Sequence, residues 1–281
     1  MKLLRYGPPG REKPGLLDGD GSVRDLSGSV GDLAGDVLSP DGLARLAALA
    51  PGSLPKVSGE HRLGPPVAGI RNFVCIGLNY ADHAAETGAN VPTEPIVFLK
   101  SLSALCGPTD DIVIPRGSTK TDWETELAVI IGSRTRYVSE QDALEHVAGY
   151  TICNDVSERE WQNERGGSWD KGKGFETFGP LGPWLVTKDE VPEPQDLTMF
   201  LDLDGQRMQE GSTRTMIFSV RHLVSYVSQC FTLHPGDVIT TGTPPGVGYG
   251  RKPQVFLSAG QVMRLGISGL GEQSHRTVAY E

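Results

Sequence analysis

Short apolar runs, separated by glycine, proline and polar residues, recur along most of the chain. Runs of this length are typical of β-strands, whereas apolar residues spaced three or four apart are typical of one face of a helix. Helices are expected at about residues 41–49, from a capping-box sequence at residue 139 to about 147, and along the apolar stripe 220–227. Strands are expected at Lys2–Tyr6, Ser22–Leu26, Phe73–Leu78, Ile96–Leu99, Ile112–Ile114, Leu127–Ile131 and Met263–Ile267. Because strands do not alternate strictly with helices, the pattern favours a β-rich α+β fold over a doubly wound sheet.

The pattern also divides the chain into two parts. Residues 1–66 are expected to form a small N-terminal domain that ends in a linker rich in proline, glycine and serine at 51–66. Residues 67–281 are expected to form the larger domain, which contains every motif with recognisable chemistry.

Composition and charge narrow the class of protein. The net charge of -9 and the pI near 5.2 speak against nucleic acid or an anionic membrane surface as the main partner. The N-terminus lacks the apolar segment of a signal peptide, and no run approaches the length of a membrane span. The four widely spaced cysteines are interpreted as buried reduced thiols. We therefore expect a cytoplasmic enzyme with a small-molecule substrate.

Three acidic residues, Glu124, Glu126 and Asp155, predict a metal site. Side chains alternate between the faces of a strand, so Glu124 and Glu126 point the same way at the start of the apolar run Leu127–Ile131. Unpaired carboxylates are costly at the edge of a buried sheet, and Mg²⁺ or Mn²⁺ prefers such oxygen ligands. Asp155 follows another apolar run and is the best third ligand. The alternative is that the Glu-x-Glu pair is a solvated strand edge.

His83 and Glu86 lie three residues apart in an alanine-rich segment that is expected to be helical. A carboxylate beside an imidazole orients the ring and makes it a better base, so the pair could activate water. The alternative is a helical pair on the protein surface.

Two further stretches carry basic side chains that could bind an anion. Arg159 and Gln162 are expected within one helical turn of each other near the metal, where Arg159 could hold a substrate carboxylate. Lys173 lies in a glycine-punctuated loop, residues 169–183. Three carboxylates and one divalent cation leave a charge of about -1, and octahedral coordination leaves three positions, which suits a bidentate α-keto acid. The alternative for Arg159 is an ion pair with an acidic neighbour: Glu158, Glu160 or Glu164.

From about residue 72 onward the chain resembles the fumarylacetoacetate hydrolase superfamily. The motifs that carry the resemblance occur in the family's order: Gly77-Leu78-Asn79-Tyr80, Asp122-Trp123-Glu124-Thr125-Glu126-Leu127, Asn154-Asp155-Val156-Ser157, Lys173-Gly174-Phe175-Glu176-Thr177 and Thr241-Gly242-Thr243-Pro244-Pro245-Gly246-Val247-Gly248. The resemblance implies a mixed β-sheet roll, a homodimer, and Mg²⁺ or Mn²⁺ at positions matching Glu124, Glu126 and Asp155. It also implies a mobile lid that carries His83 and Glu86. Four residues match substrate-contact positions: Arg159, Gln162, Lys173 and Thr243.

The segment Ser157-Glu158-Arg159-Glu160 departs from the commoner Ser-Ala-Arg-Asp pattern of the family, and residues 165–172 also differ. These departures resemble a subgroup that hydrolyses diketo deoxy sugar acids and often bears the name ureidoglycolate lyase. The expected reaction is hydrolysis of a carbon–carbon bond in a 2,4-dioxo acid, such as 2,4-diketo-3-deoxy-L-fuconate, with His83, Glu86 and Lys173 as catalytic residues. The alternatives are decarboxylation of an oxaloacetate-type acid, isomerisation of a keto acid, a ureidoglycolate lyase, and non-catalytic keto acid binding.

Overall fold

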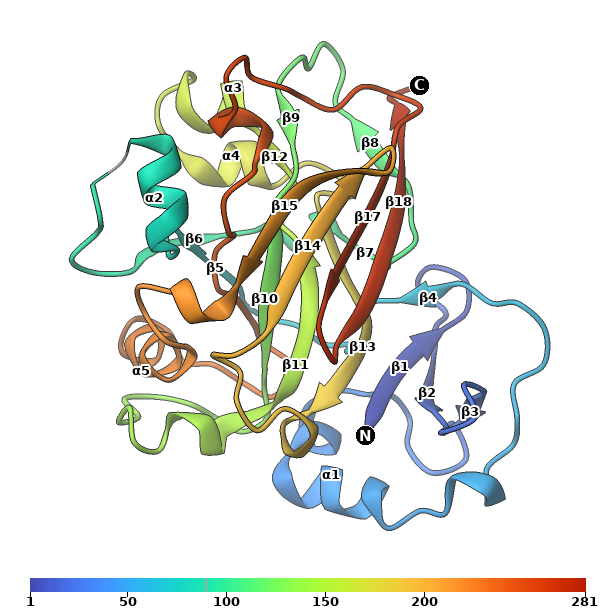
Figure 1. The fold of residues 1–281 in the computed structure, drawn as a ribbon. Coiled ribbons are helices and arrows are strands. Elements are labelled where there is room, and N and C mark those ends of the chain that lie inside the picture. The colour runs from blue at the N-terminus through green and yellow to red at the C-terminus, as the bar shows by residue number, and fades with distance from the viewer. Residues whose placement is uncertain (89) are drawn as a thin grey trace.

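Two mixed β-sheets form the centre of the protein. The computed structural model describes residues 1–88 and 90–281 (Figure 1). The larger sheet contains, in spatial order, β3 (Val23–Asp25), β2 (Lys13–Leu17), β1 (Lys2–Tyr6), β13 (Gly179–Thr187), β11 (Val147–Asn154), β10 (Thr125–Ile131), β16 (Val238–Thr240), β5 (Phe73–Gly77) and β6 (Ile96–Leu99), with β4 (Leu63–Gly64) beside β1 and β7 (Leu105–Cys106) beside β13. The second contains β15 (Gln206–Ser212), β14 (Thr198–Leu203), β17 (Val262–Ile267), β18 (Gly271–Ala279) and β8 (Ile112–Ile114). The short strands β9 (Thr121–Asp122) and β12 (Ser157–Glu158) form a separate pair.

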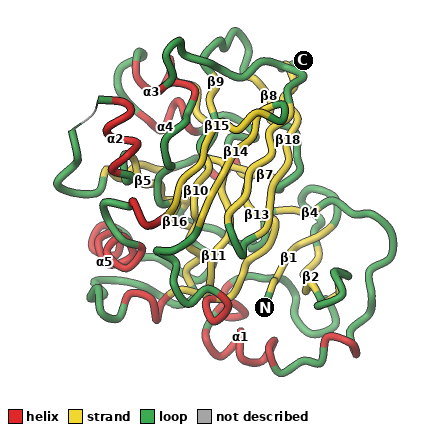
Figure 2. Tube along the Cα trace, viewed as in Figure 1, coloured by secondary structure: helices red, strands yellow, loops and turns green. Residues whose placement is uncertain are grey.

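The helices are few and short, and they lie around the sheets (Figure 2). The α-helices are α1 (Pro40–Ala47), α2 (Ala81–Thr87), α3 (Arg159–Asn163), α4 (Trp169–Lys173) and α5 (Val220–Cys230). The 3-10 turns are η1 (Gly35–Leu38), η2 (Pro51–Ser53), η3 (Leu102–Ala104), η4 (Ala143–His146), η5 (Lys188–Glu190), η6 (Thr213–Thr215) and η7 (Gly248–Gly250). Side-chain caps begin three of the α-helices: Ser39 accepts from Gly42 N in α1, Glu158 accepts from Trp161 N in α3, and Ser219 accepts from His222 N in α5. The β-rich α+β class expected from the sequence is confirmed.

Strand β10 is the centre of the core because both of its faces are buried. Leu127, Val129 and Ile131 belong to a cluster that also contains residues of β14, β17 and α5. Ala128 and Ile130 alternate with them and belong to a second cluster, with residues of α1, β1 and β5. An apolar strand of this kind is fixed in register, since a shift of one residue would exchange the two faces. The carboxylates at its start are therefore held firmly in place.

The first 66 residues join the larger sheet through β1, which pairs antiparallel with β13. Leu38 and Leu46 pack on the same apolar cluster as Ala128 and Ile130 of β10. Arg62 adds a polar link, since it donates to both carboxylate oxygens of Asp110. The N-terminal segment thus supports the sheet beneath the carboxylates, while the proposed domain boundary stays a prediction.

All the strands expected from the pattern are present, but two other predictions are wrong. The helix expected at residues 139–147 is only the 3-10 turn Ala143–His146. Ser139 does accept a hydrogen bond from Asp142 N, but the residues from Val147 onward pair with β10 and β13, which prevents the turn from continuing as a helix. The glycine-punctuated stretch 169–183 is not one loop, because it contains α4 and the start of β13.

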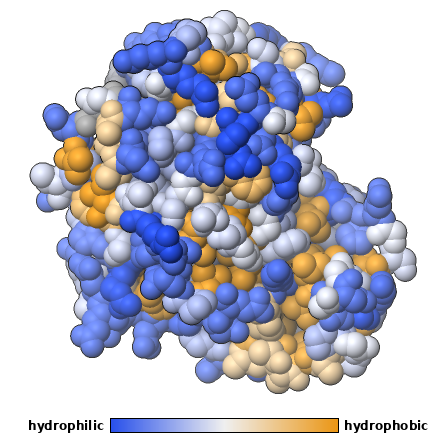
Figure 3. Space-filling model, viewed as in Figure 1, coloured by the Kyte–Doolittle hydropathy of each residue, from blue (hydrophilic) through white to orange (hydrophobic). Residues whose placement is uncertain are grey.

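The surface in Figure 3 is hydrophilic over most of its upper part, with apolar side chains gathered at the lower end over α1 and the N-terminal strands. Within the described part of the chain, no helix combines the length and apolar character needed to cross a membrane. All four cysteines are free; three are buried as expected, but Cys230 at the end of α5 is exposed.

Candidate metal centre and active site

Three buried carboxylates meet at one end of the β10–β11 pair. Glu124 directly precedes β10, Glu126 lies within it, and Asp155 directly follows β11. Thr125 and Asn154 are register partners in this antiparallel pair, and Asp155 N donates to Glu124 O at 2.8 Å. One carboxylate oxygen from each of the three residues lies within 4.8 Å of the others. The structure therefore brings together the three carboxylates that the sequence pattern singled out.

Two buried lysines neutralise part of this negative charge. Lys173 Nζ lies 2.7 Å from Glu124 Oε2 and 2.7 Å from Asp155 Oδ2. Lys100 Nζ lies 2.6 Å from Asp155 Oδ1 and also donates to the carbonyl of Lys173 at 2.6 Å. Because Lys100 contacts both Asp155 and the backbone of Lys173, it sets the position of one relative to the other.

The surrounding charges affect Glu124 and Glu126 in opposite ways. Burial raises the pKa of Glu124, but the charges of Lys173 and Arg159 outweigh this effect and lower its pKa to about 2. Burial and then the charges of Asp155 and Glu124 raise the pKa of Glu126 well above its usual value. Burial lowers the pKa of Lys173, but Asp155 and Glu124 outweigh it and hold that pKa above the usual range.

Glu126 is the carboxylate that most clearly requires a further cation. It has no ion-pair partner among the described residues, and its Oε2 accepts from Gly242 N at 2.8 Å. Gly242 has a φ of +88°, a backbone conformation that favours glycine, and this directs its N–H toward the carboxylate. A buried carboxylate with neighbouring negative charges is stabilised by a metal ion. The buried oxygen ligands of Glu124, Glu126 and Asp155 therefore fit a hard divalent cation.

Arg159 begins α3 and lies against the carboxylate cluster. Its Nη2 lies 2.7 Å from both Asp122 Oδ2 and Glu124 Oε1, and its Nη1 donates to Gln162 Oε1 at 3.0 Å. The structure thus places Arg159 and Gln162 together, as expected, one helical turn apart. The guanidinium is paired with Asp122 and Glu124, so the alternative of a pair with its acidic neighbours in sequence does not hold.

The pair His83 and Glu86 lies on α2, and His83 lines the same pocket as Glu124 and Arg159. His83 Nδ1 is 3.2 Å from Glu86 Oε2, and the Glu86 carboxylate also accepts from Gly246 N at 3.0 Å. Burial raises the pKa of Glu86, but the hydrogen bonds from His83 and Gly246 outweigh this effect and lower it. Glu86 is therefore an ionised acceptor at neutral pH that orients the imidazole and connects α2 to the loop after β16.

That loop, residues 241–247, supplies Thr243. The Thr243 hydroxyl donates to the carbonyl of Thr125 at 2.9 Å and accepts from Gln209 Nε2 at 2.8 Å. The hydroxyl is thus fixed beside the first residue of β10.

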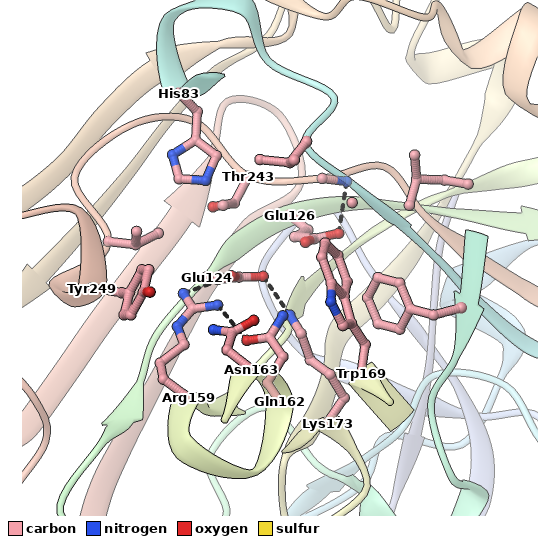
Figure 4. A pocket seen from close by; sticks show the side chains of 16 residues that line it. His83, Glu124, Glu126, Arg159, Gln162, Asn163, Trp169, Lys173, Thr243 and Tyr249 are labelled. Atoms are coloured by element: carbon pink, nitrogen blue, oxygen red, sulfur yellow. Dashed lines mark hydrogen bonds and ion pairs between the residues drawn. The ribbon is translucent and has the colours of Figure 1, made fainter. Parts of the chain in front are cut away.

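Many of these groups line one pocket of about 240 Å³ (Figure 4). His83, Tyr249 and Arg159 lie on one side of it, and Lys173 and Trp169 lie on the other. Its volume is below the range of about 300–1,000 Å³ usual for drug-sized ligands, so it suits a small molecule. The lining residues are Ile76, Gly77, Leu78, His83, Phe98, Glu124, Glu126, Arg159, Gln162, Asn163, Trp169, Lys173, Gly242, Thr243, Val247 and Tyr249.

Sequence patterns alone do not reveal several members of this site. Lys100 follows an apolar strand with no local motif, and its contact with Asp155 depends on how distant strands pair. Asp122 stands two residues before Glu124, so the same alternation could have indicated it. Asn163 and Tyr249 line the pocket from α3 and η7, and nothing in their local sequence marks them.

Comparisons with known proteins agree with this geometry. Residues 72–278 match the family model described as fumarylacetoacetate (FAA) hydrolase C-terminal. A Burkholderia multivorans protein that bears only the general name of a hydrolase is 66% identical over 280 residues, which cover 99% of each chain. A fumarylacetoacetate hydrolase from Exiguobacterium antarcticum is 34% identical, with a TM-score of 0.86 and full coverage of both chains. Maleylpyruvate hydrolase from Sphingobium sp. SYK-6, in complex with manganese(II) and pyruvate, is 28% identical, with a TM-score of 0.82 and full coverage of both chains.

Proposed function

The chain belongs to the fumarylacetoacetate hydrolase family, and from this membership we propose that it is a metal-dependent hydrolase that cleaves the carbon–carbon bond of an acylpyruvate, a 2,4-dioxo acid, to pyruvate and a second acid. The manganese- and pyruvate-bound relative supports both the metal and the product. Mg²⁺ or Mn²⁺ is the proposed ion, at Glu124, Glu126 and Asp155.

One observation carries the proposal: Glu124 and Glu126 of the carboxylate cluster line the same pocket as His83, which is paired with Glu86. Decarboxylation or isomerisation of a keto acid requires stabilisation of an enolate but no attacking water. A protein that only binds a keto acid requires neither enolate stabilisation nor an attacking water. The oriented pair His83–Glu86 supplies a base for water, which favours hydrolysis.

When bound, the divalent ion would supply Lewis-acid polarisation of the oxygens at the 2-oxo acid end of the substrate. Arg159 and Lys173 flank Glu124 and would attract the substrate carboxylate and offset negative charge that develops on the enolate. Gln162 would donate a hydrogen bond to the substrate, and Thr243 would contact it from the loop after β16.

His83 would take a proton from water at Nε2, since its Nδ1 faces Glu86. The water oxygen then bonds to C4 of the substrate, and the C3–C4 bond breaks with its electron pair moving to C3 as the enolate of pyruvate. The proton on His83 returns to C3, which gives pyruvate, and the acyl group leaves as a carboxylic acid. Glu86 stabilises the imidazolium between these two transfers.

Turnover of acylpyruvates and of a 2,4-diketo-3-deoxy sugar acid with Mg²⁺ or Mn²⁺, followed by mass spectrometry of the products, tests this proposal. Pyruvate plus a second acid, abolished in Glu124→Ala, Glu126→Ala and retained in the exposed control Glu210→Ala, is the expected result. Release of CO₂ from oxaloacetate, or turnover of ureidoglycolate, without cleavage of any dioxo acid would contradict it.

Besides the metal ion, the proposed ligand is an anionic keto acid. A homodimer, which family membership favours, is proposed as well, and sedimentation velocity of the metal-loaded protein would test it.

A further inference from the structure

Positive charge in the pocket lies next to the carboxylate cluster. Arg159 and Lys173 are the cations among the described lining residues, and both are paired with the carboxylate cluster. With Lys100 they provide three buried cations against four buried carboxylates: Asp122, Glu124, Glu126 and Asp155. A divalent ion would change the formal net charge of these seven side chains from -1 to +1, and one substrate carboxylate would then neutralise it.

Apart from His83, the side chains around the rest of the pocket are apolar or uncharged polar groups. Leu78, Val247 and Trp169 present apolar surface there. The Asn163 amide and the Tyr249 hydroxyl are exposed polar groups for which no hydrogen bond occurs within the described part of the chain. In Figure 4 the Asn163 side chain lies beside that of Gln162 in the lining of the pocket. These groups can hydrogen-bond to an uncharged acyl chain but cannot neutralise an anion.

The apolar wall is rigid, so it cannot easily make room for a charged group. A Cβ atom at Gly77 would lie 2.3 Å from Trp169 Cζ3, which shows how closely the indole packs on β5. The indole also contacts Phe98 edge-to-face, with ring centroids 5.4 Å apart. Asp170 accepts from Leu99 N at 2.8 Å and fastens α4 to β6.

Two other basic side chains, Arg251 and Lys252, line a neighbouring groove that shares Tyr249 with the pocket. Arg251 donates to the carbonyl of Met208 at 2.8 Å, and its charge contributes to the lowered pKa of Glu86. Neither side chain lines the pocket itself.

We propose that this pocket selects 2,4-dioxo acids with a single carboxylate and an uncharged acyl end, and discriminates against acylpyruvates that carry a second carboxylate at that end. The inference rests on the proposed function. A second carboxylate would be desolvated beside Trp169 and Leu78 without gaining an oppositely charged partner. Such a desolvation penalty contributes to specificity as much as attractive contacts do.

A matched pair of substrates tests the selection. 2,4-Dioxoheptanoate and 2,4-dioxoheptanedioate have the same chain length and differ only in the terminal methyl or carboxylate group. For the Mg²⁺-loaded enzyme we expect kcat/KM to be at least tenfold higher for the monocarboxylate. Calorimetric titration of the Mg²⁺-loaded His83→Ala variant, in which turnover is suppressed, is expected to show at least a tenfold lower Kd for the monocarboxylate.

A positive charge introduced at an exposed lining position should remove most of this preference. Asn163→Lys is expected to reduce the kcat/KM ratio by at least tenfold, mainly through better use of the dicarboxylate. Gln229→Lys adds the same charge at an exposed position on α5 and should leave the ratio unchanged.

Equal or tighter binding of the dicarboxylate by the wild-type pocket would overturn the inference, as would an unchanged ratio in Asn163→Lys. If the wild type cleaves neither compound, the proposed function fails, and calorimetry with the wild-type protein still decides the charge selection.

Discussion

Oδ2 of Asp122 lies 2.9 Å from Nε and 2.7 Å from Nη2 of Arg159, and both side chains are buried. The same carboxylate accepts from the backbone N–H groups of Gly248 at 2.7 Å and Tyr249 at 2.9 Å. Asp122 therefore fixes the guanidinium and the turn that carries Tyr249. The side of the pocket that Arg159 and Tyr249 form therefore depends on one carboxylate that does not belong to the cluster of Glu124, Glu126 and Asp155.

We expect Asp122→Asn to raise KM by about 10- to 100-fold, because a hydrogen bond to a charged group contributes about 1.5–3 kcal/mol and about 1.4 kcal/mol is a tenfold change. The change in kcat should be smaller, and Mn²⁺ affinity should remain within a few-fold of wild type. Steady-state kinetics and Mn²⁺ titration would measure these effects. Asp196→Asn, which breaks an exposed ion pair with Arg214, is the control and should leave KM unchanged. A KM like that of wild type in Asp122→Asn would show that Arg159 needs no such support.

His83→Ala should lower kcat by about 10²- to 10⁴-fold, the usual contribution of a general base. Metal affinity should be unchanged, because His83 is not part of the carboxylate cluster. His222→Ala provides the control, since His222 also pairs with a glutamate, Glu140 at 2.8 Å, but lies on α5 away from the pocket. Loss of Mn²⁺ binding in His83→Ala would mean that the histidine contributes to the metal site instead.

Local alternation explains why the carboxylates could be predicted from the sequence. Glu124 and Glu126 are separated by one residue, so the geometry of a strand fixes their common face, and Asp155 stands at the end of the strand that pairs with them. His83 and Glu86 likewise depend only on helical spacing. In such cases the spacing of the residues along the sequence is enough to predict the contact.

The contacts that could not be predicted depend on long-range pairing. Lys100 reaches Asp155 only because β6 and β11 belong to one sheet, and no spacing in the sequence encodes that order. The helix expected after Ser139 fails for the same reason, since Val147 onward is already paired on both edges. Tertiary pairing outweighs a favourable local cap.

Protonation of Asp110 should make the folded protein less stable in acid. Burial raises the pKa of Asp110, but the hydrogen bonds from Arg62 and Gly107, with the charge of Arg62, outweigh it and lower the pKa from its usual 3.8. A lowered folded-state pKa means that the stabilisation is present above the usual value and is lost as the pH falls below it. In thermal unfolding, Asp110→Asn should be less stable than wild type at pH 7, and the difference should shrink below about pH 4. The exposed neighbour Asp111→Asn serves as the control, and a difference that is constant with pH would contradict the role of this ion pair.

A divalent ion should stabilise the folded protein through Glu126 in particular. Because Glu126 has no ion-pair partner among the described residues, while Glu124 and Asp155 are paired with lysines, the ion would relieve the largest unbalanced charge there. At a Mn²⁺ concentration of about 100 times Kd, binding adds about 2.7 kcal/mol, and we expect Tm to rise by about 5 °C or more. Glu126→Gln retains the size of the side chain but should lose most of this Mn²⁺-dependent rise, whereas Glu272→Gln, at a half-exposed ion pair with Arg264, should retain it. Thermal unfolding with EDTA and with Mn²⁺ measures both. An equal rise in Glu126→Gln would place the ion elsewhere and remove the basis for assigning Lewis-acid chemistry to this carboxylate cluster.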